Sequence, residues 1–493
     1  MEFNRIPTIM QRYTFDAIMN ECHKCAIHIM GVNKIDIYVK DAVYPWELDV
    51  IVLFGLLVEK KYSFQTFEGK NYRKFIEIVN CIRNYHHPLL NPDNVSSDWA
   101  EKFMMVTGLT QFSVQEDSRY KFYRYNCFFN FQNKNIDLKS IFKDKFKVSY
   151  SDFRIPVQFI YLLYSTKKLI TQDPEHKILK YIVKKFAPAL EQLVINRNDF
   201  IYKQSEILKN DIDNYYYSFK YFYQYPFIRC GDDKIILPLP YLLLNATTDS
   251  LLYRITEGNN RLRQVIGKEV IESYLCKILI DSNAYDEVFP EQKYKNNGTV
   301  ARSPDVLTRK DDYFVLFDSK SSVPKITLRE FDNSSLDKTI QIYSDSIVQI
   351  FKQIKHFNLY NPFKNRAEID YNNIFGIITL LEDSNIFRNK IYDRAAKTLG
   401  ITVDSDDYKF LQSNIMILAL KDIEKFSFNS VDFIDELVER RDDSTKWNDM
   451  TVNISKNKKT LSWAKEFDDF ISNCHNDFQK IIEELKNNKL LDI

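Results

Sequence analysis

The second half of the sequence predicts an α/β fold, a mixed β-sheet with helices on both faces. Three apolar runs, 313–319, 374–380 and 415–420, have the length and the β-branched or aromatic content of buried strands. Amphipathic segments of helical period lie before, between and after them. Strands that alternate with helices in this way are typical of an α/β domain. The first half of the sequence shows mainly helical periodicity.

The length of the chain predicts more than one structural unit. Its 493 residues exceed what one hydrophobic core usually holds, and the 45% of apolar residues are enough for several cores. We expect a mainly helical N-terminal region over 1–250, an α/β domain over 255–440 and a helical C-terminal extension over 441–493. Because the N-terminal region has no recognisable active site, we expect it to serve recognition, regulation or oligomerisation.

The N-terminal region is expected to hold helices and one small hairpin. Periodicity predicts helices at 1–35, 50–58, 72–82, 155–163 and 179–193. Pro45 is placed to begin the helix that includes 50–58, because proline is favoured in a first helical turn. Two apolar runs at 227–229 and 234–237 flank a Gly-Asp-Asp turn, which is the pattern of a β-hairpin.

Within the α/β domain the predicted order is helix, strand, strand, strand, helix, strand, strand. The two helices are 267–280 and 336–357, and another helix at 433–440 follows the last strand. The first three strands, 285–294, 300–307 and 313–319, are expected to form a meander. In the C-terminal extension, Trp463, Phe467, Phe470 and Ile471 form an apolar docking stripe.

The strand at 313–319 ends in charged residues that a buried strand rarely carries without a function. Side chains alternate along a strand, so Asp318 and Lys320 point to one face and Ser319 to the other. Burying such charges is costly unless they are used. If the preceding strand pairs with this one, Asp305 brings a second carboxylate beside them. Two carboxylates and a lysine are suited to hold a hard divalent cation and to activate a water molecule.

Pro304, Asp305, Asp318 and Lys320 together resemble the motif of the PD-(D/E)xK nuclease superfamily, which has the restriction-endonuclease-like fold. The resemblance covers roughly residues 262 to 380, about a quarter of the chain. It implies a mixed sheet flanked by helices and a nuclease that depends on Mg²⁺ or Mn²⁺. Taken singly, each residue has a structural explanation, since aspartates cap turns and a lysine can be a solvated strand end.

The family also places a glutamate on the helix before the strands, often in a glycine-x-x-apolar-glutamate pattern. Gly267 and Glu272 fit this pattern with one extra residue between them. Glu272 borders the apolar stripe of its helix, whereas Glu269 lies nearly opposite and is expected to be solvated. A glutamine on the helix after the lysine strand is a further family feature, and Gln349 is the preferred candidate over Gln353. By resemblance, Gln349 would position the phosphate or a neighbouring ligand.

The resemblance also implies a role for each of the other site residues. Asp305 would be the central metal ligand, and Asp318 the second, helped by the carbonyl of Ser319. Glu272 would bind a second ion or order a metal-bound water molecule. Lys320 would orient or deprotonate the attacking water, as an amine near carboxylates can do.

We therefore expect a phosphodiester hydrolase that acts as an endonuclease on double-stranded DNA in restriction or antiphage defence. The net charge of +1 means that nucleic acid must bind to a local basic patch. Besides nucleic acid, the partners considered are a second copy of the chain, in a homodimer, and a partner or activator protein. The sequence does not distinguish DNA from RNA as the substrate. The alternative is a catalytically inactive nuclease-fold protein that binds nucleic acid or another protein. The candidate phosphate contacts are Lys268, Lys293, Lys295, Arg302, Lys325 and Arg329.

Cysteine usage and hydropathy favour a cytoplasmic protein that does not enter the membrane. The seven cysteines are odd in number and scattered, which favours reduced thiols. The longest uncharged apolar run, 50–58, is too short to span a bilayer. Cys22 and Cys25 form a lone Cys-x-x-Cys without a second ligand pair, so packing is favoured over zinc binding. The aromatic run 215–223 suits base stacking or, as we favour, packing.

Overall fold

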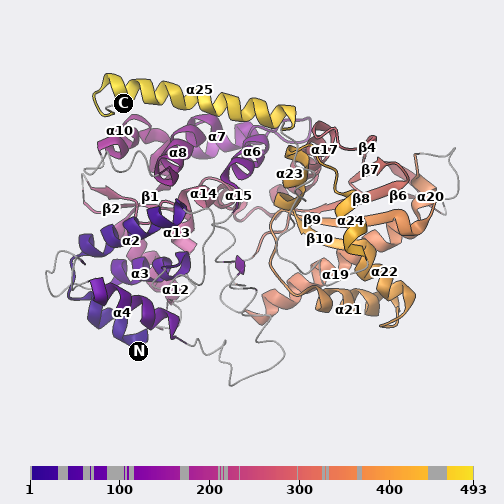
Figure 1. The fold of residues 1–493 in the computed structure, drawn as a ribbon, viewed down its shortest axis with the longest axis horizontal. Coiled ribbons are helices and arrows are strands. Elements are labelled where there is room, and N and C mark those ends of the chain that lie inside the picture. Colours follow the sequence, from indigo (N-terminus) through magenta and orange to yellow (C-terminus); the bar gives the residue numbers. More distant parts are fainter. Residues whose placement is uncertain are drawn as a thin grey trace.

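The computed structural model shows a mixed α/β architecture, with a helical region beside an α/β domain (Figure 1). It describes residues 3–31, 43–58, 67, 72–85, 105, 108–109, 116–166, 177–208, 211, 215, 220–231, 234–296, 298–324, 328, 332–362, 369–441 and 463–491. None of the helices within these ranges combines the length and the apolar character that a membrane-spanning segment needs.

The first helices form a hydrophobic core of their own with α12 and the small sheet. The predicted single helix over 1–35 is wrong in one respect, because the chain turns before Thr14. The side chain of Thr14 accepts a hydrogen bond from the Ala17 N–H at 3.1 Å and so caps a new helix. Pro45 begins the next helix, as predicted. The helices of this core are α1 (Ile6–Met10), α2 (Phe15–Met30), α3 (Pro45–Leu57), α4 (Tyr72–Arg83) and α12 (Arg197–Leu208).

Most of the helices in a second set share a hydrophobic core with the α/β domain, whereas Phe222 of α13 belongs to the first core. The predicted hairpin is confirmed, because β2 (Phe227–Arg229) and β3 (Ile235–Ile236) pair antiparallel, and β1 (Val194–Asn196) adds a parallel strand. The predicted helix 179–193 is divided, with a new helix starting where Pro188 stands in the first turn. The helices of this set are α6 (Ser118–Phe129), α7 (Leu138–Phe146), α8 (Tyr150–Ser165), α10 (Lys177–Lys185), α11 (Ala187–Leu190), α13 (Lys220–Gln224), α14 (Leu242–Ala246) and α15 (Asp249–Thr256).

The α/β domain is built on a five-stranded sheet with the order β10-β9-β8-β7-β4. Strands β8, β9 and β10 are parallel neighbours, whereas β7 pairs antiparallel with both β8 and β4. The parallel strands are apolar on both faces, as strands covered on both sides must be. The strands are β4 (Glu287–Pro290), β7 (Val306–Lys310), β8 (Tyr313–Lys320), β9 (Ile374–Leu380) and β10 (Ile415–Ala419).

Helices cover both faces of this sheet, as Figure 1 shows. Val315 and Phe317 of β8 pack toward α17 and α23, whereas Phe314 and Leu316 pack toward α19 and α21. This alternation follows from the strand repeat of two residues. The covering helices are α17 (Glu272–Asp281) and α23 (Leu420–Phe428) on one face, and α19 (Asn333–Lys355), α21 (Arg388–Leu399) and α22 (Asp406–Asn414) on the other. Shorter helices are α16 (Asn260–Val265), α20 (Phe357–Tyr360) and α24 (Ile434–Arg441).

The predicted meander is present but carries an inserted hairpin. The segments 285–294 and 300–307 are each divided into two strands, and β4 pairs directly with β7. The other two, β5 (Lys293–Asn296) and β6 (Thr299–Arg302), pair with each other in a separate antiparallel hairpin. Pro290 ends β4 and Pro304 precedes β7, and neither can donate a ladder hydrogen bond. The two prolines therefore mark where the hairpin leaves the sheet.

The C-terminal extension lies on the helices of the N-terminal half. Its helix α25 (Lys465–Asn487) packs against α6 and α8 (Figure 1). The predicted docking stripe is confirmed, since Phe467 is fully buried and stacks on Phe428 with ring centroids 4.3 Å apart. One continuous core runs from α6 and α8 to α17, the sheet and α25. Residues on both sides of positions 250 and 441 contribute to this core. The division of the chain at these positions stays a prediction.

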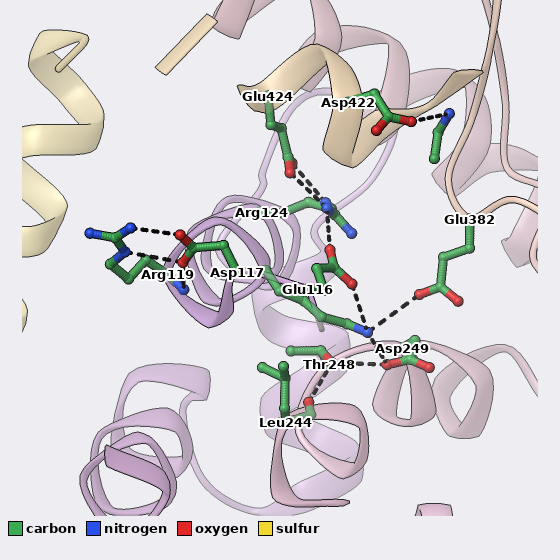
Figure 2. Close-up of polar contacts among 12 residues, drawn as sticks. Glu116, Asp117, Arg119, Arg124, Leu244, Thr248, Asp249, Glu382, Asp422 and Glu424 are labelled. Carbon is green, nitrogen blue, oxygen red and sulfur yellow. Dashed lines mark hydrogen bonds and ion pairs between the residues drawn. The ribbon is translucent and has the colours of Figure 1, made fainter. Parts of the chain in front are cut away.

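A network of buried charges joins α6 to the α/β domain (Figure 2). Lys121 and Arg124 of α6 are each only 1% exposed. Lys121 Nζ lies 3.1 Å from an Asp249 oxygen and 3.7 Å from Glu382, which follows β9. Arg124 donates two hydrogen bonds to Glu424 of α23, at 2.7 and 2.6 Å. Removing one partner would leave an uncompensated buried charge, so the network holds the helical region on the sheet.

Candidate functional site

The ends of β7 and β8 bring two aspartates close together at one end of the hairpin. Val306 pairs with Phe317, Asp305 immediately precedes Val306, and Asp318 immediately follows Phe317. The backbone N–H and the hydroxyl of Ser319 both donate to Asp305 Oδ2, at 2.7 and 2.8 Å. These two hydrogen bonds hold the Asp305 carboxylate against the end of β8. The pairing of the two carboxylates that the sequence predicted is therefore present.

Lys320 and Gln349 form a hydrogen-bonded group with Asp318. Gln349 Nε2 of α19 donates to Asp318 Oδ1 at 3.0 Å, and Lys320 Nζ donates to Gln349 Oε1 at 3.2 Å. Lys320 Nζ also lies 2.5 Å from Asp318 Oδ2. Asp318 and Lys320 thus share the face covered by α19, as the strand alternation predicts. The structure brings the glutamine helix and the lysine strand together at this point.

Glu272 reaches the site from the opposite helix because the helix contains a π-turn. Ile266–Ile271 form a π-helix, and the Glu272 N–H donates to the carbonyl of Gly267, five residues earlier. A π-turn accommodates one extra residue in a helix. The extra residue between Gly267 and Glu272 is therefore absorbed, and both residues face the end of β8. A Cβ at Gly267 would lie 3.0 Å from the Ser321 hydroxyl, so the helix approaches closely there.

Glu269 differs from its prediction. It is half-buried instead of solvated, and its carboxylate accepts a hydrogen bond from Asn133 at 2.8 Å. Hydrogen bonds from Asn135 and Asn133 lower the pKa of Glu269. The α7–α6 connection that supplies these asparagines lies far away in sequence, so helical periodicity alone missed the contact. Glu269 lines the same cavity as Glu272 without sharing its carboxylate neighbours.

The carboxylates of the site repel one another. Burial raises the pKa of Glu272 to about 8, and the charges of Asp305 and Glu291 add to that rise. The pKa of Asp305 is raised by burial and then by Asp318, while the pKa of Asp318 is raised mainly by burial. Carboxylates with raised pKa values favour a bound cation, because positive charge would relieve both the repulsion and the lost hydration. Glu291 was not among the predicted site residues, and nothing in its local sequence marks it.

The residues present fit a divalent cation through one feature in particular. Asp318 is 2% exposed, and its Oδ2 atom has no well-directed hydrogen bond although Lys320 Nζ is near. A buried carboxylate oxygen of this kind is suited to an ion. Within the described ranges, no group of three or more histidine, cysteine, aspartate or glutamate residues stands ready as a complete ligand set. Asp305, Asp318 and the Ser319 carbonyl would hold the ion, with Glu272 beside them.

A cavity of about 580 Å³ opens beside these residues. Glu272 and Asp305 line it from the site. Lys268 of the π-helix and Lys277 of α17 also line it. Of the predicted phosphate contacts, Lys268 therefore faces the cavity. Lys293, Lys295 and Arg302 lie instead on the hairpin formed by β5 and β6, whereas Lys325 and Arg329 fall outside the described ranges.

Other sequence features take structural roles. Cys22 is fully buried in α2, and burial raises its pKa well above the ordinary value, so core packing explains it. Tyr215 stacks on Phe54 with centroids 4.4 Å apart, which is a packing contact. Residues 216–219 of the aromatic run lie outside the described ranges.

Comparisons with known proteins add no relative. A scan against protein-family models, a search of curated proteins and a search of solved structures each found no match to this chain. What the site does is therefore inferred from its own side chains and their geometry.

Proposed function

We propose that this chain is a metal-dependent nuclease that hydrolyses phosphodiester bonds in DNA, in restriction or antiphage defence. One observation carries the proposal: hydrogen bonds from Ser319 hold Asp305 against the end of β8, where Asp318, Lys320 and Gln349 form a hydrogen-bonded group. These are the residues that the family resemblance names, and they come from two strands and a helix. If these charged residues were ordinary strand ends without a common function, a shared hydrogen-bonded group with Gln349 of a separate helix would not be expected.

The arrangement of elements supports the same proposal. The predicted order of helix, three strands, helix and two strands recurs as α17, β4, β7, β8, α19, β9 and β10. Two helices that were not predicted, α21 and α22, stand between β9 and β10 and connect these parallel strands. We take this sheet as a restriction-endonuclease-like core. The hairpin β5–β6 is an insertion between the first two strands of that core.

Each site residue has a chemical task under this proposal. A divalent ion on Asp305 and Asp318 would supply charge neutralisation at the phosphate and a more acidic water. Lys320 Nζ, held by Gln349, is placed to orient the attacking water or to take its proton. Ser319 fixes Asp305 through two hydrogen bonds, so the carboxylate keeps one orientation. Glu272 adds a further carboxylate at the cavity wall.

The second candidate is a nuclease-fold protein without catalysis, which binds nucleic acid or a partner protein. It is favoured by the close contact between Lys320 and Asp318, which resembles an ordinary buried ion pair. The two candidates make opposite predictions for cleavage.

Purified protein incubated with supercoiled plasmid and with RNA, each with and without Mg²⁺ or Mn²⁺, separates these candidates. We expect metal-dependent cleavage of DNA that is lost in Asp305→Asn. Asp311→Asn is the matched control, because Asp311 is exposed at the far end of the same hairpin with φ +51°, a conformation that asparagine tolerates. No cleavage of either nucleic acid by the unmodified protein would favour the second candidate.

A further inference from the structure

The hairpin of β5 and β6 is a two-stranded arm with one exposed face. Its register pairs Lys293 with Arg302 and Lys295 with Val300. Directly opposed residues of an antiparallel pair lie on the same face, and so do residues two apart. These four side chains therefore share one face of the arm. All four are exposed, and Val300 reaches 70%.

The opposite face and the base of the arm are held in place. The Tyr294 ring packs on Tyr360 of α20 with centroids 5.0 Å apart. At the base, the Ser303 N–H donates to the Gln292 carbonyl at 2.9 Å, and the Gln292 N–H donates to the Ser303 hydroxyl at 2.8 Å. Asp305 follows Ser303 by two residues. The arm is therefore anchored next to the candidate site and keeps a defined direction from it.

The exposed face is basic in a protein that is nearly neutral. Neither Lys293 nor Lys295 takes part in an ion pair within the part of the chain that the structure describes. Arg302 donates to Glu291 at 2.8 and 3.1 Å, and Glu291 lines the cavity beside Asp305. With a net charge of +1, the chain needs a local patch of this kind to attract a polyanion.

We propose that this arm binds double-stranded DNA and aligns it with the cavity, an inference that rests on the proposed nuclease function. Lys293 and Lys295 contact phosphates, and Val300 supplies an apolar contact in the groove. The major groove of B-form DNA, about 12 Å wide, admits a two-stranded β-ribbon. The major groove of A-form RNA is deep and narrow and excludes one. The shape of the arm therefore favours duplex DNA over duplex RNA.

The test is DNA binding by the full-length chain without divalent ions, so that cleavage plays no part. The probe is a short fluorescein-labelled DNA duplex, with duplex RNA and single-stranded DNA of the same sequence in parallel. The arm variant is Lys293→Gln/Lys295→Gln. Its control is Lys338→Gln/Lys397→Gln, which removes the same charge from exposed positions on α19 and α21. Anisotropy titrations over about 50 to 200 mM salt give both affinity and its salt dependence.

We expect the arm variant to bind duplex DNA roughly tenfold more weakly, with the slope of log K against log salt reduced by about 2. The control should match the unmodified protein. Equal affinities and slopes for the arm variant and its control would overturn the inference. An equal loss for duplex RNA or single-stranded DNA would overturn the ribbon-in-groove assignment.

Cleavage assays on the same proteins separate this inference from the nuclease proposal. If the unmodified protein cleaves DNA while the arm variant binds like its control, the arm inference fails and the nuclease proposal stands. If binding depends on the arm lysines but no metal-dependent cleavage occurs, the arm inference stands and the nuclease proposal fails.

Discussion

Replacing Asp305 with asparagine should stabilise the metal-free protein while it abolishes cleavage. Asp305 lies beside the buried Asp318 at the end of the hairpin, and burial and the charge of Asp318 both raise the pKa of Asp305. The Asp305→Asn change removes one charge and keeps an oxygen that accepts from the Ser319 N–H and hydroxyl. The hydrogen bonds that fix the strand end are therefore retained, and only the repulsion is lost.

The cost of charging Asp305 has two sources, burial and the charge of Asp318. Together they raise the pKa of Asp305 from 3.8 to about 6, and burial is the larger cause. At 1.36 kcal/mol for each pKa unit, this rise corresponds to about 3 kcal/mol, which is the gain expected when the charge is removed.

The sign of the pH dependence follows from the raised pKa. The charged form of Asp305 is disfavoured in the folded protein, so its cost is absent below pH 3.8, grows as pH rises and is complete above about pH 6. The stability gained by Asp305→Asn should therefore be full at pH 8 and small near pH 4. Saturating Mg²⁺ should stabilise the unmodified protein more than the variant, because binding to the folded state adds stability.

Thermal unfolding with and without Mg²⁺, at several pH values, measures these effects. The entropy of unfolding is about 2.1 cal/mol/K per residue, so for 493 residues a gain of about 3 kcal/mol raises Tm by roughly 3 °C. Asp311→Asn removes a charge from the exposed turn of the same hairpin and should leave Tm unchanged. If Asp305→Asn lowers Tm at pH 8, or if it retains full cleavage with Mg²⁺, the assignment of Asp305 as a crowded metal ligand is wrong.

Four further outcomes test the site and its assembly. Lys320→Ala should abolish cleavage without loss of the fold, whereas the Lys310→Ala protein, changed at the other end of the hairpin, should cleave DNA at the normal rate. Equal cleavage rates for the two variants would show that Lys320 takes no part in the reaction. Glu272→Gln should lower kcat more than Glu269→Gln, because Glu272 has the carboxylate neighbours. A larger loss of kcat in Glu269→Gln would show that the helix presents Glu269 to the site instead. Gly267→Ala should reduce kcat, because its new Cβ meets Ser321 at 3.0 to 3.1 Å, and unchanged kcat would show that the close approach is not needed. Light scattering should show a dimer, since one chain carries one site and a double-strand cut needs two; a monomer that makes concerted double-strand breaks would contradict it.

Much of the fold was predictable because its elements are encoded by local patterns. The apolar runs at 313–319, 374–380 and 415–420 are strands in the structure, with small differences at their ends. Strand alternation predicted that Asp318 and Lys320 share a face, and both contact Gln349. The inserted hairpin was not predicted. Its strands have ordinary periodicity, and the prolines that separate them from the sheet act on pairing, which is a nonlocal property.

The glutamate helix shows the limit of periodicity most clearly. The sequence indicated that Glu272 borders the buried stripe, and the residues of that stripe are buried. The π-turn that places Glu272 at the cavity begins where Gly267 approaches Ser321, and a helical wheel with 3.6 residues per turn does not represent it. The hydrogen bond from Asn133 to Glu269 was missed for a different reason, because the two residues are far apart in sequence.

By itself, the sequence determined the main strands of the sheet, the helices before and after the first three of them, the residue types at the end of β8 and the expectation of a carboxylate pair. These depend on hydrophobic periodicity and on spacing along the chain, which are local. Only the tertiary structure decided that Ser319 holds Asp305 against the end of β8, that Glu291 joins the cavity and that Lys121 and Arg124 hold the helical region on the sheet. These contacts join residues that are far apart in sequence. They form because buried charges must find partners, and no local pattern specifies which partners those are.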